Sequence, residues 1–217
     1  MYSLTLKRKI QLSTVLIIIA AGLAFSFSAI DSQASSEGRS DNAESAASAM
    51  SQMTQAFARY DSEGALIRPT GYREWVYIGT PLTPNDMNGG NAAFPEFHNV
   101  YVDPVSWAEY KKSGEFPDGT VVIKELVSVG GKSASSGKGY FMGEFVGLEA
   151  AVKDSKRFPK EANGWAYFSF GHSYPLEKKV KAQAQASCAQ CHLTAPGGSM
   201  VFSQYYPVLR ARAVSAK

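Results

Sequence analysis

"PDGTVVIKELVSV", residues 117–129, joins a turn to an extended apolar segment. Pro117, Asp118 and Gly119 are turn formers, and residues 121–129 are rich in the β-branched side chains that favour strands. The segment therefore predicts a strand at 121–129. In that strand Lys124 shares a face with Val122 and Leu126, so its amine would point into apolar surroundings.

The flanking sequence predicts further strands separated by turns and few helices. Expected strands are 72–80, 98–102, 140–146 and 165–170, the last two flanking a charged connection and able to pair as a hairpin. Expected helices are 104–113, 175–191 and 200–212, the last interrupted at Pro207. This order predicts a mainly β (α+β) fold, an antiparallel sheet with flanking helices, and not a doubly wound α/β fold.

Both cysteines of the chain lie in "SCAQCH", residues 187–192. A redox disulfide normally sits in a βαβ context, which is missing here, and zinc usually draws a second pair of ligands. Cys-x-x-Cys-His is the attachment signature of c-type haem, in which the adjacent histidine binds iron. The motif predicts haem c on Cys188 and Cys191, with His192 as the proximal ligand.

The N-terminus resembles a signal peptide. Lys7, Arg8 and Lys9 precede an uncharged run, and small residues follow, with 32–34 as the best cleavage tripeptide. An uncleaved membrane anchor is the alternative. We expect a signal peptide at 1–34, a flexible segment at 35–59 and one haem domain at 60–217.

The charge balance gives no case for nucleic-acid binding. Removal of residues 1–34 takes away three basic residues and one acidic residue, so the net charge falls from +3 to +1. Export to the periplasm also agrees with covalent haem, which is attached outside the cytoplasm in bacteria.

The second axial position of the iron decides what such a haem does. Met200 lies close after His192 and would reach the opposite face awkwardly, and Met142 fits the strand pattern as core filler. His98 and His172 are possible ligands, although single histidines more often have structural roles. We therefore expect an open distal site.

Four ordered blocks resemble the cytochrome P460 family. They are "NVYVDPVSWAEYKKSGEFPDGTVVIKELVSVG", "GYFMGEFVGLEAAVKDSKRF", "GWAYFSF" and "CAQCH…MVFSQYYPVLRA". The resemblance implies a periplasmic, mostly β-sheet homodimer. Its five-coordinate haem c would oxidise hydroxylamine and also bind nitric oxide. Electrons would pass to an unidentified periplasmic acceptor of the c-type cytochrome class.

The resemblance also implies roles for three residues. Lys124 matches the lysine bonded to a haem meso carbon, and Glu149 matches a distal carboxylate that takes protons from substrate. His98 stands where the ammonia-oxidiser form carries arginine, so it would change charge and hydrogen bonding near neutral pH if it faces the haem. From the residues alone, Lys124 could instead extend past an edge or pair near Glu125, Glu149 could be a solvated strand-end residue, and His98 a surface residue.

Three functions follow from these alternatives. The first is a hydroxylamine-oxidising enzyme with cross-linked haem. The second is a cytochrome c′-β-like protein that binds nitric oxide without the cross-link. The third is an electron carrier with methionine or histidine as sixth ligand.

Overall fold

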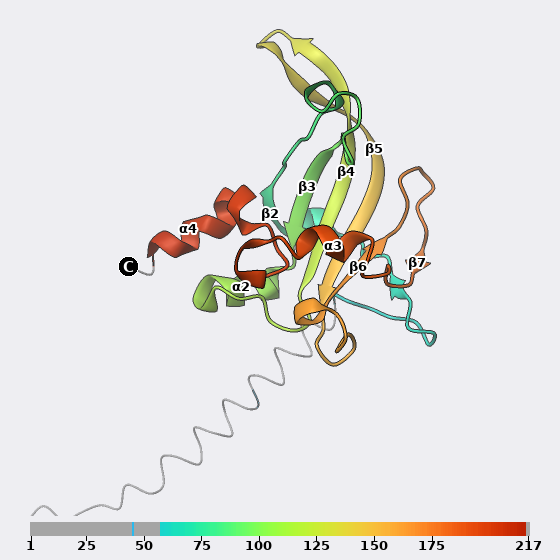
Figure 1. Cartoon of the computed structure of the whole chain (residues 1–217), viewed down its shortest axis with the longest axis vertical. Coiled ribbons are helices and arrows are strands. Elements are labelled where there is room, and N and C mark those ends of the chain that lie inside the picture. The colour runs from blue at the N-terminus through green and yellow to red at the C-terminus, as the bar shows by residue number, and fades with distance from the viewer. Residues whose placement is uncertain (1–44, 46–56, 216–217) are drawn as a thin grey trace, which may run out of the picture.

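The computed structural model describes residue 45 and residues 57–215 (Figure 1). The predicted signal peptide lies outside the described residues, as does the predicted segment 35–59 except residues 45 and 57–59. The Phe57 ring packs edge-on against Trp75 at 5.2 Å, so side-chain packing includes residue 57. Within the described part, no helix has the length and apolar character needed to cross a bilayer.

A five-stranded antiparallel sheet forms the centre of the domain, in the order β2-β3-β4-β5-β6 (Figure 1). A two-stranded sheet, β1-β7, lies beside it. The strand bounds are Leu66–Ile67 (β1), Val76–Gly79 (β2), Phe97–Val102 (β3), Val121–Ala134 (β4), Gly137–Lys153 (β5), Trp165–Ser169 (β6) and Lys179–Val180 (β7). The predicted mainly β, antiparallel fold with flanking helices is confirmed.

The helices are short, and residues of all three pack against one face of the sheet. They are α2 (Pro104–Ser113), α3 (Cys188–His192) and α4 (Pro207–Ser215), with 3₁₀ turns η1 (Tyr72–Glu74), η2 (Asn85–Met87), η3 (Ala162–Gly164), η4 (Pro196–Gly198) and η5 (Ser203–Tyr205). The prediction for α2 is confirmed. Buried Asp103 caps it by accepting from Ser106 N at 2.8 Å, and its other oxygen accepts from Val121 N at 2.9 Å, which ties the helix to β4.

The β4–β5 hairpin is longer than predicted, and the predicted pairing of 140–146 with 165–170 is wrong. Residues 140–146 lie opposite β4, whereas β6 pairs with Glu149–Lys153. The stretch from Gly147 to Lys153 reads as a charged connection but continues the strand, because Leu148, Ala150 and Val152 are buried on one face. The outer part of the hairpin extends beyond the core, as Figure 1 shows, so its sequence need not be apolar.

The predicted helix at 175–191 is also wrong except for its last turn. Arg68 holds the backbone extended there: its guanidinium donates to Leu176 O at 2.7 Å, and its N–H donates to Lys178 O at 2.9 Å. Lys179 and Val180 then pair with β1. Helix propensity is a weak preference, and these tertiary hydrogen bonds override it.

Two other predictions hold in part. The first turn of the predicted strand 72–80 is the 3₁₀ turn η1, and only Val76–Gly79 is extended. In the C-terminal segment, Pro207 starts α4 and does not interrupt a longer helix. Proline suits this position because its missing N–H has no partner in the first helical turn.

The central sheet buries a cluster of side chains on each face. On one face Ile123, Leu148 and Phe168 pack with the N-terminal part of the domain. On the other, Val100, Trp165 and Tyr167 pack with residues of α2, α3 and α4. Strand alternation therefore decides which residues meet the C-terminal haem motif.

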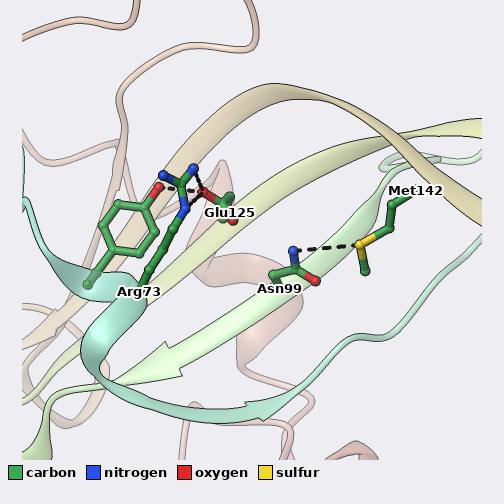
Figure 2. A network of polar contacts seen from close by, with 5 residues as sticks. Arg73, Asn99, Glu125 and Met142 are labelled. Carbon is green, nitrogen blue, oxygen red and sulfur yellow. Dashed lines mark hydrogen bonds and ion pairs between the residues drawn. The ribbon is translucent and has the colours of Figure 1, made fainter.

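Alternation along β4 places Glu125 on the opposite face of the sheet from Lys124. Glu125, with 1% of its surface exposed, accepts a hydrogen bond there from Arg73 Nε at 3.0 Å and another from Tyr72 Oη at 2.5 Å, and Figure 2 shows Arg73 against Glu125. The pairing of Lys124 with the Glu125 neighbourhood is thus excluded. Met142, expected as core filler, is 50% exposed, and its sulfur lies 4.0 Å from Asn99 Nδ2.

Candidate haem site

The two thiols lie on the single turn of α3, in front of the sheet (Figure 1). Residues three apart in a helix lie on the same face, so Cys188 and Cys191 are presented together. Cys188 is half-buried, Cys191 is exposed, and neither forms a disulfide in this structure. Burial raises the pKa of the Cys188 thiol.

His192 is held in one orientation. Its Nδ1 donates to the Met200 carbonyl at 2.8 Å, and its ring lies between those of Tyr167 (4.4 Å) and Phe202 (4.9 Å). The bond at Nδ1 leaves Nε2 as the coordinating nitrogen. Burial lowers the pKa of His192, which keeps the imidazole neutral and able to bind a metal.

A cavity of about 350 Å³ lies between α3 and the sheet, and its wall is mainly apolar. Cys188, Cys191 and His192 line it on one side, and Lys124 and Glu149 are its charged residues on the sheet. A larger cavity of about 660 Å³, lined by residues such as Tyr110 and Lys153, includes none of the haem motif. The smaller cavity is the one with the required chemistry.

Lys124 and Glu149 are direct cross-strand partners on β4 and β5. Lys124 Nζ lies 2.5 Å from Glu149 Oε2, with 24% and 14% of the two side chains exposed. In the same row, Val100 on β3 lies opposite Lys124, and Ser169 on β6 lies opposite Glu149. Strand register alone therefore places an amine and a carboxylate side by side on the cavity wall.

Phe94 and His172 complete the surroundings of this ion pair. Lys124 Nζ lies 4.0 Å from the centre of the Phe94 ring, which lines the cavity. His172 Nε2 lies 3.0 Å from Glu149 Oε1, so the two carboxylate oxygens have different partners. His172, considered from sequence as an iron ligand, is in this structure a partner of Glu149.

His98 lies just outside the cavity, two residues from Val100 on the same face of β3. Its ring packs edge-on against Phe94 at 5.8 Å, and its buried Nε2 has no hydrogen-bond partner among the described residues. Burial, and secondarily Lys124, lowers the pKa of His98 to about 4. His98 is therefore neutral near pH 7 and does not change its charge there.

Acidification should destabilise the fold through His98. In the unfolded chain the His98 imidazole takes up a proton near pH 6.5, but in the folded chain it does so only near pH 4. The contribution of neutral His98 to stability is therefore fully present above pH 6.5 and is lost as the pH falls toward 4. The free energy of unfolding should fall by at most about 3 kcal/mol over this range. Denaturant unfolding of wild type and His98→Gln at pH 4–7 measures this, and equal slopes against pH would contradict it.

The residues of the cavity fit a covalent haem. The two cysteine thiols lie three residues apart on one helix. The His192 imidazole has Nδ1 hydrogen-bonded and Nε2 free to bind iron, and the cavity wall is mainly apolar. Cys188, Cys191 and His192 would hold the group, with Lys124 and Glu149 facing it from the sheet.

The sequence did not reveal several parts of the site. Phe94 lies in a Gly-, Asn- and Pro-rich connection with no periodicity, and the Met200 carbonyl carries no side-chain signal. The bond between His172 and Glu149 joins residues that are 23 positions apart in the sequence. Glu149 lies on β5, and His172 lies in the segment that follows β6. For this bond, the only indication in the sequence is that the single histidine His172 follows the predicted strand 165–170.

Comparison with known proteins agrees with this geometry. The family model for cytochrome P460 matches residues 69–203, which include the sheet, the Lys124–Glu149 pair and the haem motif. No curated protein gives a significant match. The chain therefore belongs to the cytochrome P460 family and is a c-type haem protein.

Proposed function

We propose that the protein is an exported haem c oxidoreductase that oxidises hydroxylamine, with nitric oxide as a ligand or co-substrate. The observation that carries this is the Lys124–Glu149 pair, which faces the same cavity as the Cys-x-x-Cys-His motif. Among the described residues that line the cavity, the only methionine, Met200, is bonded through its carbonyl to His192. This favours an iron with an open sixth position.

Bound haem c would supply an iron that binds hydroxylamine and accepts its electrons. The chain supplies the surroundings. Removal of two electrons from hydroxylamine releases two protons, NH₂OH → HNO + 2H⁺ + 2e⁻, whatever the later fate of the nitrogen. Glu149 is the carboxylate on the cavity wall that can accept these protons, which is general-base chemistry.

Lys124 is the residue that would form the covalent bond to a haem meso carbon that is characteristic of the family. An ammonium cannot act as a nucleophile, and Glu149, at 2.5 Å, is placed to accept its proton. Formation of the C–N bond also removes two electrons, so it requires an oxidant such as a peroxide. The apolar cavity and the Phe94 ring keep the amine out of bulk water.

The alternative is a cytochrome c′-β-like protein that binds nitric oxide without the cross-link. The ion pair itself favours it, because an amine that remains an ammonium against Glu149 stays unreactive. An electron carrier with methionine or histidine as sixth ligand would need such a side chain opposite His192. Among the described residues that line the cavity, Met200 is the only methionine and His192 the only histidine.

Localisation and partners complete the proposal. Residues 1–34 favour export to the periplasm, and the family resemblance favours a homodimer and a c-type cytochrome as electron acceptor. Sedimentation of the mature protein and fractionation of cells that express the full chain test these points.

The deciding experiment uses holoprotein matured in a host that attaches haem c. Hydroxylamine should reduce an artificial one-electron acceptor only when this protein is present. Tight nitric oxide binding without acceptor reduction would instead establish the alternative.

Lys124→Arg should separate the two functions. Arginine keeps a cation beside Glu149 but is not expected to form the haem bond, so we expect an ordinary c-haem spectrum, retained nitric oxide binding and loss of hydroxylamine oxidation. Peptide mapping should recover residue 124 bound to the haem peptide in wild type only. A wild-type map without this linked peptide would contradict the cross-link.

A further inference from the structure

We propose that His172 is the residue through which protons leave the haem cavity, passing from Glu149 to a second cavity. The proposal deepens the proposed function, on which it rests. The structure supports it with three observations: a bond between the two side chains, a gradient of exposure, and a second cavity beyond the bond that is lined in part by charged side chains.

The bond joins the buried carboxylate to an outer imidazole. Glu149 Oε1 lies 3.0 Å from His172 Nε2, while Oε2 faces Lys124. Glu149 is 14% exposed and His172 is 47% exposed, so a proton that moves from one to the other moves toward solvent. A proton received at Nε2 gives an imidazolium, which can lose its other proton from Nδ1 to water.

The backbone holds His172 in this place. Leu148 N–H on β5 donates to Gly171 O at 3.2 Å. Gly147 lets the segment approach, because a Cβ at 147 would lie 2.9 Å from Gly171 O and 3.2 Å from the Cα of His172. The Phe94 ring lies 6.0 Å from the imidazole on the other side. The imidazole is thus positioned by β5 and is not a freely moving surface side chain.

Beyond His172 lies a second cavity, of about 460 Å³. His172 lines it together with polar groups from the η2 region and the β4–β5 hairpin. These are Asp86, Glu96, Ser128, Lys132 and Tyr140. Glu96 Oε2 is buried there with no partner among the described residues, so this oxygen is free to accept a hydrogen bond from a water molecule that enters the cavity.

The charged groups around His172 favour transfer of a proton from Glu149 toward the second cavity. Glu149 is beside it on β5, and Lys124 on β4 is bound to the other oxygen of that carboxylate. Across the second cavity, Asp86 is paired with Lys132 and accepts a hydrogen bond from Tyr140 at 2.9 Å, which leaves Glu96 as the unpaired acid. His98, the other histidine near this site, contacts Phe94 and not Glu149.

His172→Gln separates proton transfer from positioning. Glutamine can still donate a hydrogen bond to Glu149 but cannot carry a proton onward. We expect hydroxylamine oxidation to slow at least about tenfold in dilute buffer, with kcat affected more than KM. A higher concentration of a buffer base that does not bind haem iron should restore the rate in His172→Ala, and it should not do so in His172→Ala combined with Glu149→Gln. Ser173→Ala, at the exposed next position, should behave as wild type.

A measurement without turnover uses cyanide. Hydrogen cyanide must lose its proton to bind ferric iron as an anion, so its association rate, followed optically, also reports proton removal. This rate should fall in both His172→Gln and Glu149→Gln and recover in His172→Ala when the concentration of the same non-coordinating buffer base is raised. Unchanged cyanide association and turnover in His172→Gln would overturn the relay.

The two proposals fail in different ways. A wild-type protein that oxidises hydroxylamine, with a His172→Gln variant equally fast, would refute the relay alone. A wild-type protein that cannot oxidise hydroxylamine, but whose cyanide association slows in His172→Gln, would refute the proposed reaction and leave the relay in place.

Discussion

Replacing both Cys188 and Cys191 with serine, in a Lys124→Arg background that removes the other proposed bond to haem, should abolish covalent haem. Each thiol forms one thioether in a c-type site, so the double variant has none, although His192 could still bind haem reversibly. The measurement is intact mass after denaturation, which should equal that of the polypeptide alone. We also expect a lower melting temperature, because a group that binds only the folded state stabilises it.

The control lies within the motif. Gln190 is exposed between the two cysteines, so Gln190→Ala should keep the full haem mass. Each single cysteine variant should retain a haem held by one thioether. Haem that still survives denaturation in the double serine variant with Lys124→Arg would show that attachment occurs elsewhere.

Glu149→Gln should lower the rate of hydroxylamine oxidation strongly. Glutamine is nearly isosteric and can still face Lys124 and His172, but it cannot accept a proton. General-base catalysis typically contributes 10²- to 10⁴-fold, so we expect kcat for hydroxylamine oxidation to fall by roughly that factor. Steady-state rates with an artificial acceptor measure it, and nitric oxide affinity should change little.

Glu144→Gln is the matched control, because Glu144 lies on the same strand but is exposed outside the cavity. It should keep the wild-type rate. If Glu149→Gln also kept that rate, another group would have to take the substrate's protons.

The sequence predicts the parts of this fold that depend on local pattern. Val121–Val129 and Pro104–Ser113 carry clear β-branched and capping signals, and both are found as expected. Residues 175–187 have helix-forming side chains, yet Arg68 fixes their backbone through long-range hydrogen bonds that no local pattern contains. The strand at 140–146 was expected, but residues 130–139 of the outer hairpin were not, because strands beyond the core lack apolar alternation.

The candidate site also has parts that local sequence pattern predicts and parts that only the folded structure shows. Alternation around Val122 places Lys124 on the cavity face, and the motif places the thiols and His192 together. The contact between Lys124 and Glu149 depends on the register of β4 against β5, which bulges at several points. The role of His172 depends on the close approach of residue 171 to Gly147, which only the folded backbone provides.

Electron paramagnetic resonance of the ferric holoprotein tests most directly whether the haem has one protein axial ligand, His192, and a free position toward Glu149. We predict a high-spin signal that changes when hydroxylamine or nitric oxide is added. A low-spin signal of a haem with two protein ligands, unchanged by either compound, would contradict an open site in this cavity.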